Sequence, residues 1–137
     1  MSTEHFIIEN RIEEIPVLAE KIELLAEKQN FPGKVTMNIN LALEEALSNI
    51  IYYAFSDNKK HLINILLSVE NKKLTIKITD DGIPFDPTLQ KEPDISLAIE
   101  DRPVGGLGIL LISKIMDTVK YSREKNLNIL TLTKHLK

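Results

Sequence analysis

The sequence contains no cysteine, and this absence excludes several kinds of site. Disulfides, thiolate zinc sites, iron–sulfur clusters and cysteine nucleophiles all require the missing side chain. Positive charge is also scarce. The net charge is -3, and Lys and Arg form no cluster that would attract a phosphate backbone or an anionic membrane surface. We therefore expect neither nucleic acid nor a membrane as a partner.

Long apolar runs are missing as well. No stretch approaches the roughly 20 apolar residues of a membrane-spanning helix, and residues 1–5 lack the basic and apolar segments of a signal peptide. We expect a cytoplasmic protein. The length of 137 residues, with 43% apolar and 27% charged residues, suits one globular domain that covers residues 1–137.

The apolar periodicity changes along the chain from helical spacing to strict alternation and back. Period-two stretches predict strands, and i, i+3, i+4 stretches predict helices. The predicted order is strand, helix, helix, two strands, a long loop, helix and two strands. The corresponding residues are about 6–8, 11–29, 34–55, 62–69, 74–80, 107–116, 118–122 and 127–133. This order predicts an α+β fold, a two-layer sandwich whose mixed, mostly antiparallel sheet is covered on one face by helices.

The loop between the fifth strand and the last helix, about residues 83–105, has the composition of a lid. Four of the six prolines fall between Asp81 and Gly106, and loops of this length inside a compact domain often bind ligands. Four of the five glycines stand at its two ends, which favours a hinged lid. They are Gly82, Gly105, Gly106 and Gly108.

Glu45 and Asn49 are four residues apart on the second predicted helix, so their side chains lie on one stripe. The small side chains of Ala42 and Ala46 beside them would let another group approach the helix closely. Both polar residues can therefore address one ligand. A solvated polar face is the simpler interpretation of this pair taken alone.

Asp80 is more informative, because strand alternation puts it on the same face as Leu74, Ile76 and Ile78, the face that the helices should cover. Gly82 follows two residues later, where glycine permits a close backbone approach. An ordinary Asp-Asp-Gly turn is the alternative, and Asp81, which has the opposite parity, is assigned to that turn.

The cluster Gly105, Gly106 and Gly108 directly precedes a helix, whose free backbone N–H groups and positive dipole end favour an anion such as phosphate. A flexible hinge is the alternative. The spacing does not match the P-loop or the dinucleotide fingerprint. The three histidines, His5, His61 and His135, are scattered without spaced metal partners, and we expect them to be surface residues.

Three segments taken together resemble a known family. They are L-E-E-A-L-S-N-I-I (residues 43–51), D-D-G-I-P-F-D-P (residues 80–87) and G-G-L-G-I-L-L-I (residues 105–112). In this order they resemble the N, G1 and G2 boxes of the Bergerat-fold ATPases. Within that superfamily the chain is similar to the stand-alone anti-sigma factor serine/threonine kinases, and the resemblance covers nearly its whole length.

The resemblance implies a site for ATP and Mg²⁺. Glu45 would be the general base that activates the attacking hydroxyl, Asn49 would coordinate Mg²⁺, and Asp80 would accept a hydrogen bond from the adenine amino group. One departure is the basic residue before the glycines, which in similar kinases lies closer to them than Arg102 does here. The remaining residues assigned to the nucleotide are Gly82, which would let the ring approach, and, around the phosphates, Arg102, Gly105, Gly106, Leu107 and Gly108.

The resemblance also implies partners. The acceptor would be a serine of a STAS-type anti-sigma antagonist, a sigma factor would be sequestered when that antagonist is phosphorylated, and the kinase would be a homodimer. The rival hypothesis is a non-catalytic, ATP-dependent protein-interaction switch, which would not need a base at Glu45. The catalytic half of a sensor histidine kinase is disfavoured, since no helical hairpin with a phosphorylatable histidine precedes the domain.

Overall fold

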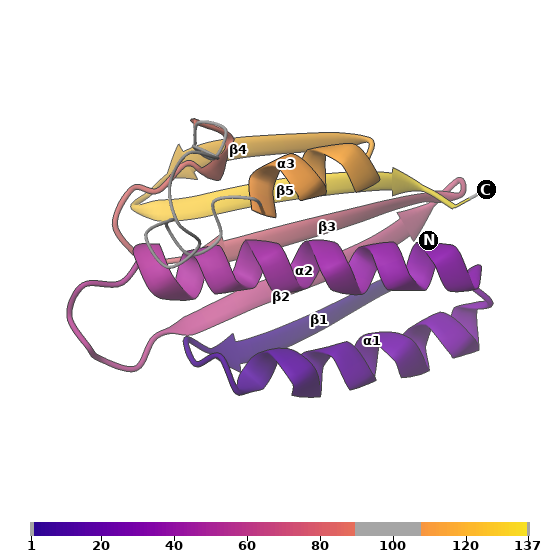
Figure 1. The fold of residues 1–137 in the computed structure, drawn as a ribbon, viewed down its shortest axis with the longest axis horizontal. Helices are drawn as coiled ribbons and strands as arrows, with labels where there is room; N and C mark the ends of the chain where they lie inside the picture. Colours follow the sequence, from indigo (N-terminus) through magenta and orange to yellow (C-terminus); the bar gives the residue numbers. More distant parts are fainter. Residues whose placement is uncertain (1, 90–107, 137) are drawn as a thin grey trace, which may run out of the picture.

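The computed structural model describes residues 2–89 and 108–136, which form two layers (Figure 1). All the predicted helices and strands are confirmed, with ends that shift by a few residues. The elements are β1 (Ser2–Glu9), α1 (Glu14–Gln29), α2 (Gly33–Tyr53), β2 (Leu62–Glu70), β3 (Lys73–Asp80), the short 3₁₀ helix η1 (Pro87–Leu89), α3 (Gly108–Ile115), β4 (Thr118–Glu124) and β5 (Leu127–His135).

The breaks between elements have local causes. Asn30 caps the end of α1 in the left-handed conformation with φ 58°, and its backbone N–H returns to the last turn of the helix. Both hairpin turns use two residues with positive φ, the geometry that matches the twist of the flanking strands. These pairs are Asn71 and Lys72 between β2 and β3, and Lys125 and Asn126 between β4 and β5.

The sheet has the strand order β1-β2-β3-β5-β4, and all four of its pairings are antiparallel. It is therefore more regular than the mixed sheet we expected. The connection from β1 to β2 passes through two helices, which reverses the strand direction. The connection from β3 to β4 makes those two strands run parallel, but β5 lies between them, so they do not pair.

The helices cover one face of the sheet, as Figure 1 shows. Alternate residues of β2 and β3 are buried beneath them, including Ile65 paired with Ile78 and Leu67 paired with Ile76. The opposite face carries polar side chains such as Thr75, Lys77 and Thr79. None of the helices within the described ranges combines the length and the apolar character that crossing a bilayer requires.

Candidate nucleotide site

Asp80 ends β3 on the helix-covered face and is only 3% exposed, so the prediction from strand parity is confirmed. Its Oδ1 accepts two hydrogen bonds of 2.9 Å, from the backbone N–H of Gly82 and from the side-chain amide of Asn128. Within the described chain Oδ2 accepts none, which leaves one carboxylate oxygen for a ligand donor. Burial raises the pKa of Asp80, and the Asn128 and Gly82 donors oppose that rise.

Asn128 holds Asp80 in place, and the sequence interpretation missed it. This buried residue lies directly opposite Asp80 in the β3–β5 pairing. Its Nδ2 also donates to the carbonyl of Ile83 at 2.8 Å. Its Oδ1 accepts hydrogen bonds from Arg123 Nη1 at 3.0 Å, from the Phe85 backbone N–H at 3.3 Å and from the hydroxyl of Tyr121. The signal was available, because alternation puts Asn128 on the apolar face of β5.

Glycine is required at position 82 because the backbone of another segment of the protein lies very close to it. A Cβ at this position would stand 2.3 Å from the carbonyl oxygen of Ala54, the residue that ends α2. The next residue, Ile83, donates its backbone N–H to that same oxygen at 2.7 Å. The structure therefore explains the glycine by the packing of the Asp80–Gly82 turn against α2, whereas the resemblance explained it by the approach of a ring.

Asn49 lies on α2 with 0% exposure, and neither Oδ1 nor Nδ2 has a hydrogen-bond partner among the described residues. A buried amide without partners costs about 1–3 kcal/mol, so such a residue calls for an explanation. A hard cation such as Mg²⁺ takes oxygen ligands and commonly needs only one or two from the protein when phosphates supply others. The unpaired Oδ1 of Asn49 fits that requirement.

Glu45 lies one turn before Asn49 on α2 and is half-buried. Burial raises the pKa of its carboxyl, and the neighbouring charge of Glu44 adds to the rise. Glu45 lines a groove of about 220 Å³ between α2 and the start of α1. The carboxylate of Glu45 therefore borders an open groove and binds protons more readily than usual. The rest of the lining is Ile12, Ile15, Pro16, Glu44, Ser48 and Tyr52.

The sequence profile of the histidine kinase-like ATPase domain matches residues 8–134. The chain belongs to this family of ATPase domains. Among curated relatives, serine/threonine-protein kinase BtrW of Bordetella bronchiseptica is 29% identical over 114 residues, which are 83% of this chain and 80% of that kinase. Serine-protein kinase RsbW of Listeria monocytogenes is 26% identical over 116 residues, 82% of this chain and 73% of that kinase.

Solved structures agree on the fold of this ATPase domain. The RsbU and RsbW domains of a Mycobacterium tuberculosis protein match with a TM-score of 0.69 at 8% identity, over 99% of this chain but 32% of that one. The catalytic domain of the histidine kinase ThkA matches with a TM-score of 0.53 at 13% identity, over 99% of this chain and 98% of that one. Membership of the family makes ATP the nucleotide that this chain uses.

Part of the predicted phosphate site of this ATPase domain lies outside the described residues. This applies to Arg102, Gly105, Gly106 and Leu107, and to residues 90–105 of the predicted lid. Gly108 is the first residue of α3. Residues 83–89, the described start of the predicted lid, include η1 and Phe85, whose ring stacks on Tyr53 with centroids 5.6 Å apart. This segment therefore packs against the end of α2.

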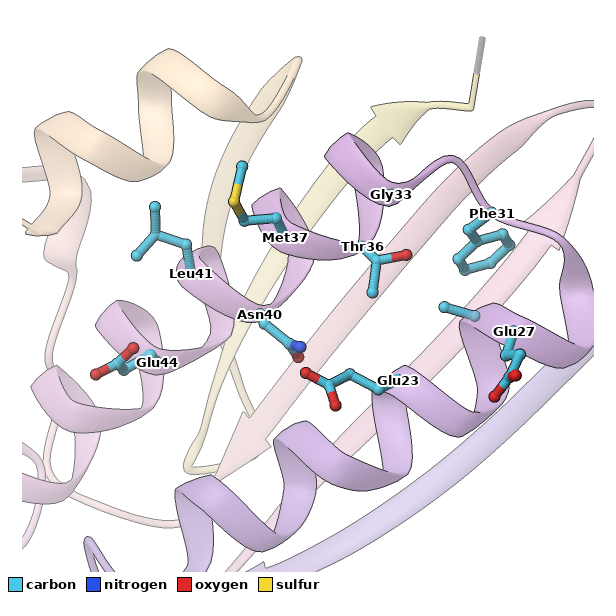
Figure 2. Close-up of a pocket in the computed structure, with 10 residues that line it drawn as sticks. Glu23, Glu27, Phe31, Gly33, Thr36, Met37, Asn40, Leu41 and Glu44 are labelled. Carbon is cyan, nitrogen blue, oxygen red and sulfur yellow. The ribbon is translucent and has the colours of Figure 1, made fainter.

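A wider groove of about 710 Å³ between α1 and α2 is not a second nucleotide site. Figure 2 shows its residues, with Asn40 and Glu23 turned towards each other between the two helices. Three carboxylates, those of Glu23, Glu27 and Glu44, line it, and its lining contains no lysine or arginine. Negative charge of this kind repels phosphate.

His61 and Asp81 take part in a side-chain cluster that the sequence did not predict. We expected a surface histidine and a turn aspartate, and Asp81 is 56% exposed directly after β3. In addition, His61 Nδ1 lies 2.9 Å from Asp81 Oδ1 and its Nε2 lies 2.8 Å from Asp57 Oδ2. The side chain of His61 is 19% exposed. The three side chains are joined by hydrogen-bond distances on both nitrogens of the imidazole, so the cluster is a bridge between Asp57 and Asp81.

Proposed function

We propose that this chain is a Mg²⁺- and ATP-dependent protein serine/threonine kinase that acts as an anti-sigma regulatory factor. The observation that carries the kinase activity is Glu45, a half-buried carboxylate with a raised pKa, which borders an open groove one turn from Asn49. The names of the relatives, both serine kinases, support the same activity. A protein that merely bound ATP would have no need of a proton acceptor there.

The nucleotide would lie between α2 and the edge of the sheet where β3 ends and β5 begins. Asp80 Oδ2 would accept the adenine amino group while Asn128 and Gly82 hold Oδ1. Asn49 Oδ1 would bind Mg²⁺, which neutralises phosphate charge and orients the transferred group. The helix that begins at Gly108 would present backbone N–H groups to the phosphates, with Arg102, Gly105, Gly106 and Leu107 contributing from the lid.

Phosphoryl transfer would then need one proton acceptor and correct positioning. The serine hydroxyl loses its proton to the carboxylate of Glu45, and its oxygen forms a bond to the γ-phosphorus. The bond between that phosphorus and the β,γ-bridging oxygen breaks, so ADP leaves with the electron pair. Because the acceptor must be deprotonated Glu45, the rate should rise with pH through the raised pKa of this residue.

The proposed acceptor is a serine of a STAS-type anti-sigma antagonist in the cytoplasm. The kinase would act as a homodimer and would sequester a sigma factor once the antagonist is phosphorylated. These partners rest on the family resemblance and on the naming of RsbW among the relatives.

The test measures transfer of ³²P from Mg-[γ-³²P]ATP to a purified STAS-domain anti-sigma antagonist from the same organism. We expect Glu45→Gln to lower the rate of labelling by about 10²-fold or more while ADP affinity stays within about twofold. Glu23→Gln, an exposed glutamate of α1 away from Asp80 and Asn49, is the matched control and should retain full labelling.

Three results are informative. Equal labelling by wild type and Glu45→Gln would show that Glu45 is not the general base. ADP binding without any labelling by the wild type would replace the kinase with the non-catalytic switch. No binding of ADP by the wild type would overturn the nucleotide site itself.

A further inference from the structure

The bridge formed by His61 joins two segments that are distant in sequence. Asp57 belongs to the connection between α2 and β2, and Asp81 belongs to the turn that carries Asp80. His61 Nε2 lies 2.9 Å and 2.8 Å from the two carboxylate oxygens of Asp57, and Nδ1 lies 2.9 Å from Asp81 Oδ1. The imidazole therefore spans the space between the connection and the turn.

This geometry favours a protonated ring. An ionised carboxylate only accepts hydrogen bonds, and a neutral imidazole has only one N–H to donate. With aspartate oxygens at hydrogen-bond distance from both nitrogens, a neutral ring would direct one lone pair at a negative charge. The imidazolium donates to both. The hydrogen bond that the ring donates to Asp57 contributes most to raising the pKa of His61 above its usual value of 6.5. Burial opposes the rise, and the hydrogen bond to Asp81 and the charges of both aspartates add to it.

The surroundings hold the ring in this position. It stacks on Phe55 with centroids 4.7 Å apart and an angle of 23° between the planes. The backbone N–H of His61 donates to Asn10 Oδ1, and the backbone N–H of Asn10 donates to the His61 carbonyl, both at 3.0 Å. His61 is thus anchored to the turn after β1 on one side and bonded to Asp81 on the other.

The charged groups around His61 are mostly carboxylates. Asp57 faces it from its own connection, and Asp81 faces it from the end of β3 with Asp80 beyond. Lys60 is the adjacent cation, and its ammonium is engaged by Glu9 at 3.1 Å. The balance of charge therefore favours the imidazolium, and loss of its proton would leave two aspartates without their shared counter-ion.

Other contacts hold the turn from the sides of β5 and α2. Asn128 bonds to Asp80 and to the Ile83 carbonyl, Arg123 Nη1 donates to the Gly82 carbonyl at 2.9 Å, and the Ala54 carbonyl accepts the Ile83 N–H. His61 supports the turn from the connection between α2 and β2. Asp81 itself, within the described part of the chain, has His61 as its side-chain partner. A change at His61 is therefore transmitted to the residues on either side of Asp81, which are Asp80 and Gly82.

We propose that protonated His61 is a positioning residue for the nucleotide, because its bridge between Asp57 and Asp81 fixes the Asp80–Gly82 turn, and that nucleotide affinity falls when the proton leaves. This inference rests on the proposed nucleotide site at Asp80. It makes the affinity for ATP and ADP sensitive to pH in the range near neutrality.

The first experiment follows the ring protons of His61 by NMR in the nucleotide-free protein from about pH 5 to pH 9. We expect His61 to titrate above the ordinary histidine pKa of 6.5. Asp57→Asn and Asp81→Asn should each lower the titration midpoint of His61. A midpoint at or below 6.5 that neither variant moves would overturn the bridge without any reference to nucleotide.

The second experiment measures the dissociation constant of Mg-ADP by calorimetry across the same pH range. We expect wild type to lose about fivefold in affinity between about pH 6 and pH 9, relative to His61→Gln, which corrects for ionisation of the ligand. His135→Gln keeps His61, so this control should follow wild type. His61→Gln cannot titrate, so its affinity should be weaker at pH 6 and should lack this pH-dependent step.

The variant Asp81→Asn should preserve nucleotide affinity at high pH. A purely structural role of His61 would not predict this result. Its side-chain amide can donate to the lone pair of neutral Nδ1 while Nε2–H still donates to Asp57, so the bridge survives deprotonation. The affinity of this variant should therefore stay nearly constant as the pH rises. If wild type, His61→Gln and Asp81→Asn share one pH profile, the positioning role is wrong. Absence of ADP binding at every pH would instead overturn the underlying nucleotide site.

Discussion

Two buried asparagines, Asn128 and Asn49, differ in how their amides are satisfied. Asn128 on β5 is 4% exposed, and its amide bonds to the side chains of Asp80, Arg123 and Tyr121 and to two backbone groups. Asn49 on α2 is 0% exposed and makes no hydrogen bond to the described residues. The two asparagines are almost equally buried, but the amide of Asn128 is satisfied by hydrogen bonds and that of Asn49 is not.

The difference separates a residue of the scaffold from a residue of the proposed ligand site. Each hydrogen bond of Asn128 replaces one lost to water, so this residue stabilises the fold and orients Asp80. The unsatisfied amide of Asn49 lowers the stability of the free protein by about 1–3 kcal/mol. Such a cost is common at functional sites, where the missing partner belongs to the ligand.

Among the substitutions that test the contrast between Asn128 and Asn49, Asn128→Leu should have the largest effect on stability. The substitution removes the donors and acceptors that satisfy Asp80, Ile83 and Arg123, and it leaves a buried carboxylate with one fewer donor. We expect the free energy of unfolding to fall by about 3 kcal/mol and ADP binding to weaken by more than about tenfold. Urea denaturation and calorimetry measure the two effects. A decrease in the free energy of unfolding of less than about 1 kcal/mol would contradict the role of Asn128 in satisfying Asp80, Ile83 and Arg123.

The matched substitution Asn49→Leu should behave in the opposite way. Leucine has a similar volume and no unsatisfied polar atoms, so the free energy of unfolding should stay equal or rise by about 1 kcal/mol. Binding of Mg-ADP should weaken by about tenfold or more, while Mg²⁺ should no longer improve the affinity of the variant for ADP. Clear destabilisation of Asn49→Leu would show that this amide serves the fold, and the contrast with Asn128 would disappear.

A smaller effect is expected for Asp80→Asn, which tests the carboxylate that Asn128 holds. Burial raises the folded-state pKa of Asp80 above the ordinary value of 3.8, so the folded protein binds more protons than the unfolded chain in this range. The contribution of Asp80 to stability is therefore present below pH 3.8 and is lost as the pH rises through the raised pKa. Asp80→Asn should remove this dependence of the free energy of unfolding on pH.

The measurement for Asp80→Asn is the free energy of unfolding at several pH values between about pH 3.5 and pH 7, for wild type and variant. The variant should gain stability relative to wild type as the pH rises, yet bind ADP more weakly, since its amide donor would face the adenine amino group. A variant less stable than wild type at pH 7 would mean that the ionised carboxylate contributes more through its hydrogen bonds than its burial costs.

Strand parity predicted the burial of Asp80 from the sequence, because the alternation of Leu74, Ile76 and Ile78 fixes which side of β3 each residue occupies. The same reasoning applied to β5 would have found Asn128. His61 could not be found in this way. Its partner Asp81 lies 20 residues away, and their contact depends on how the connection after α2 folds back to the end of β3.

The sequence by itself determined the elements, their order and the two-layer architecture, since periodicity and turn residues are local properties of the chain. It also determined the family, through three ordered segments. The tertiary structure decided why Gly82 must be glycine, which amides are satisfied and which histidine lies between two aspartates. These depend on atoms that only folding brings together, such as the Ala54 carbonyl beside Gly82 and the two aspartates around His61.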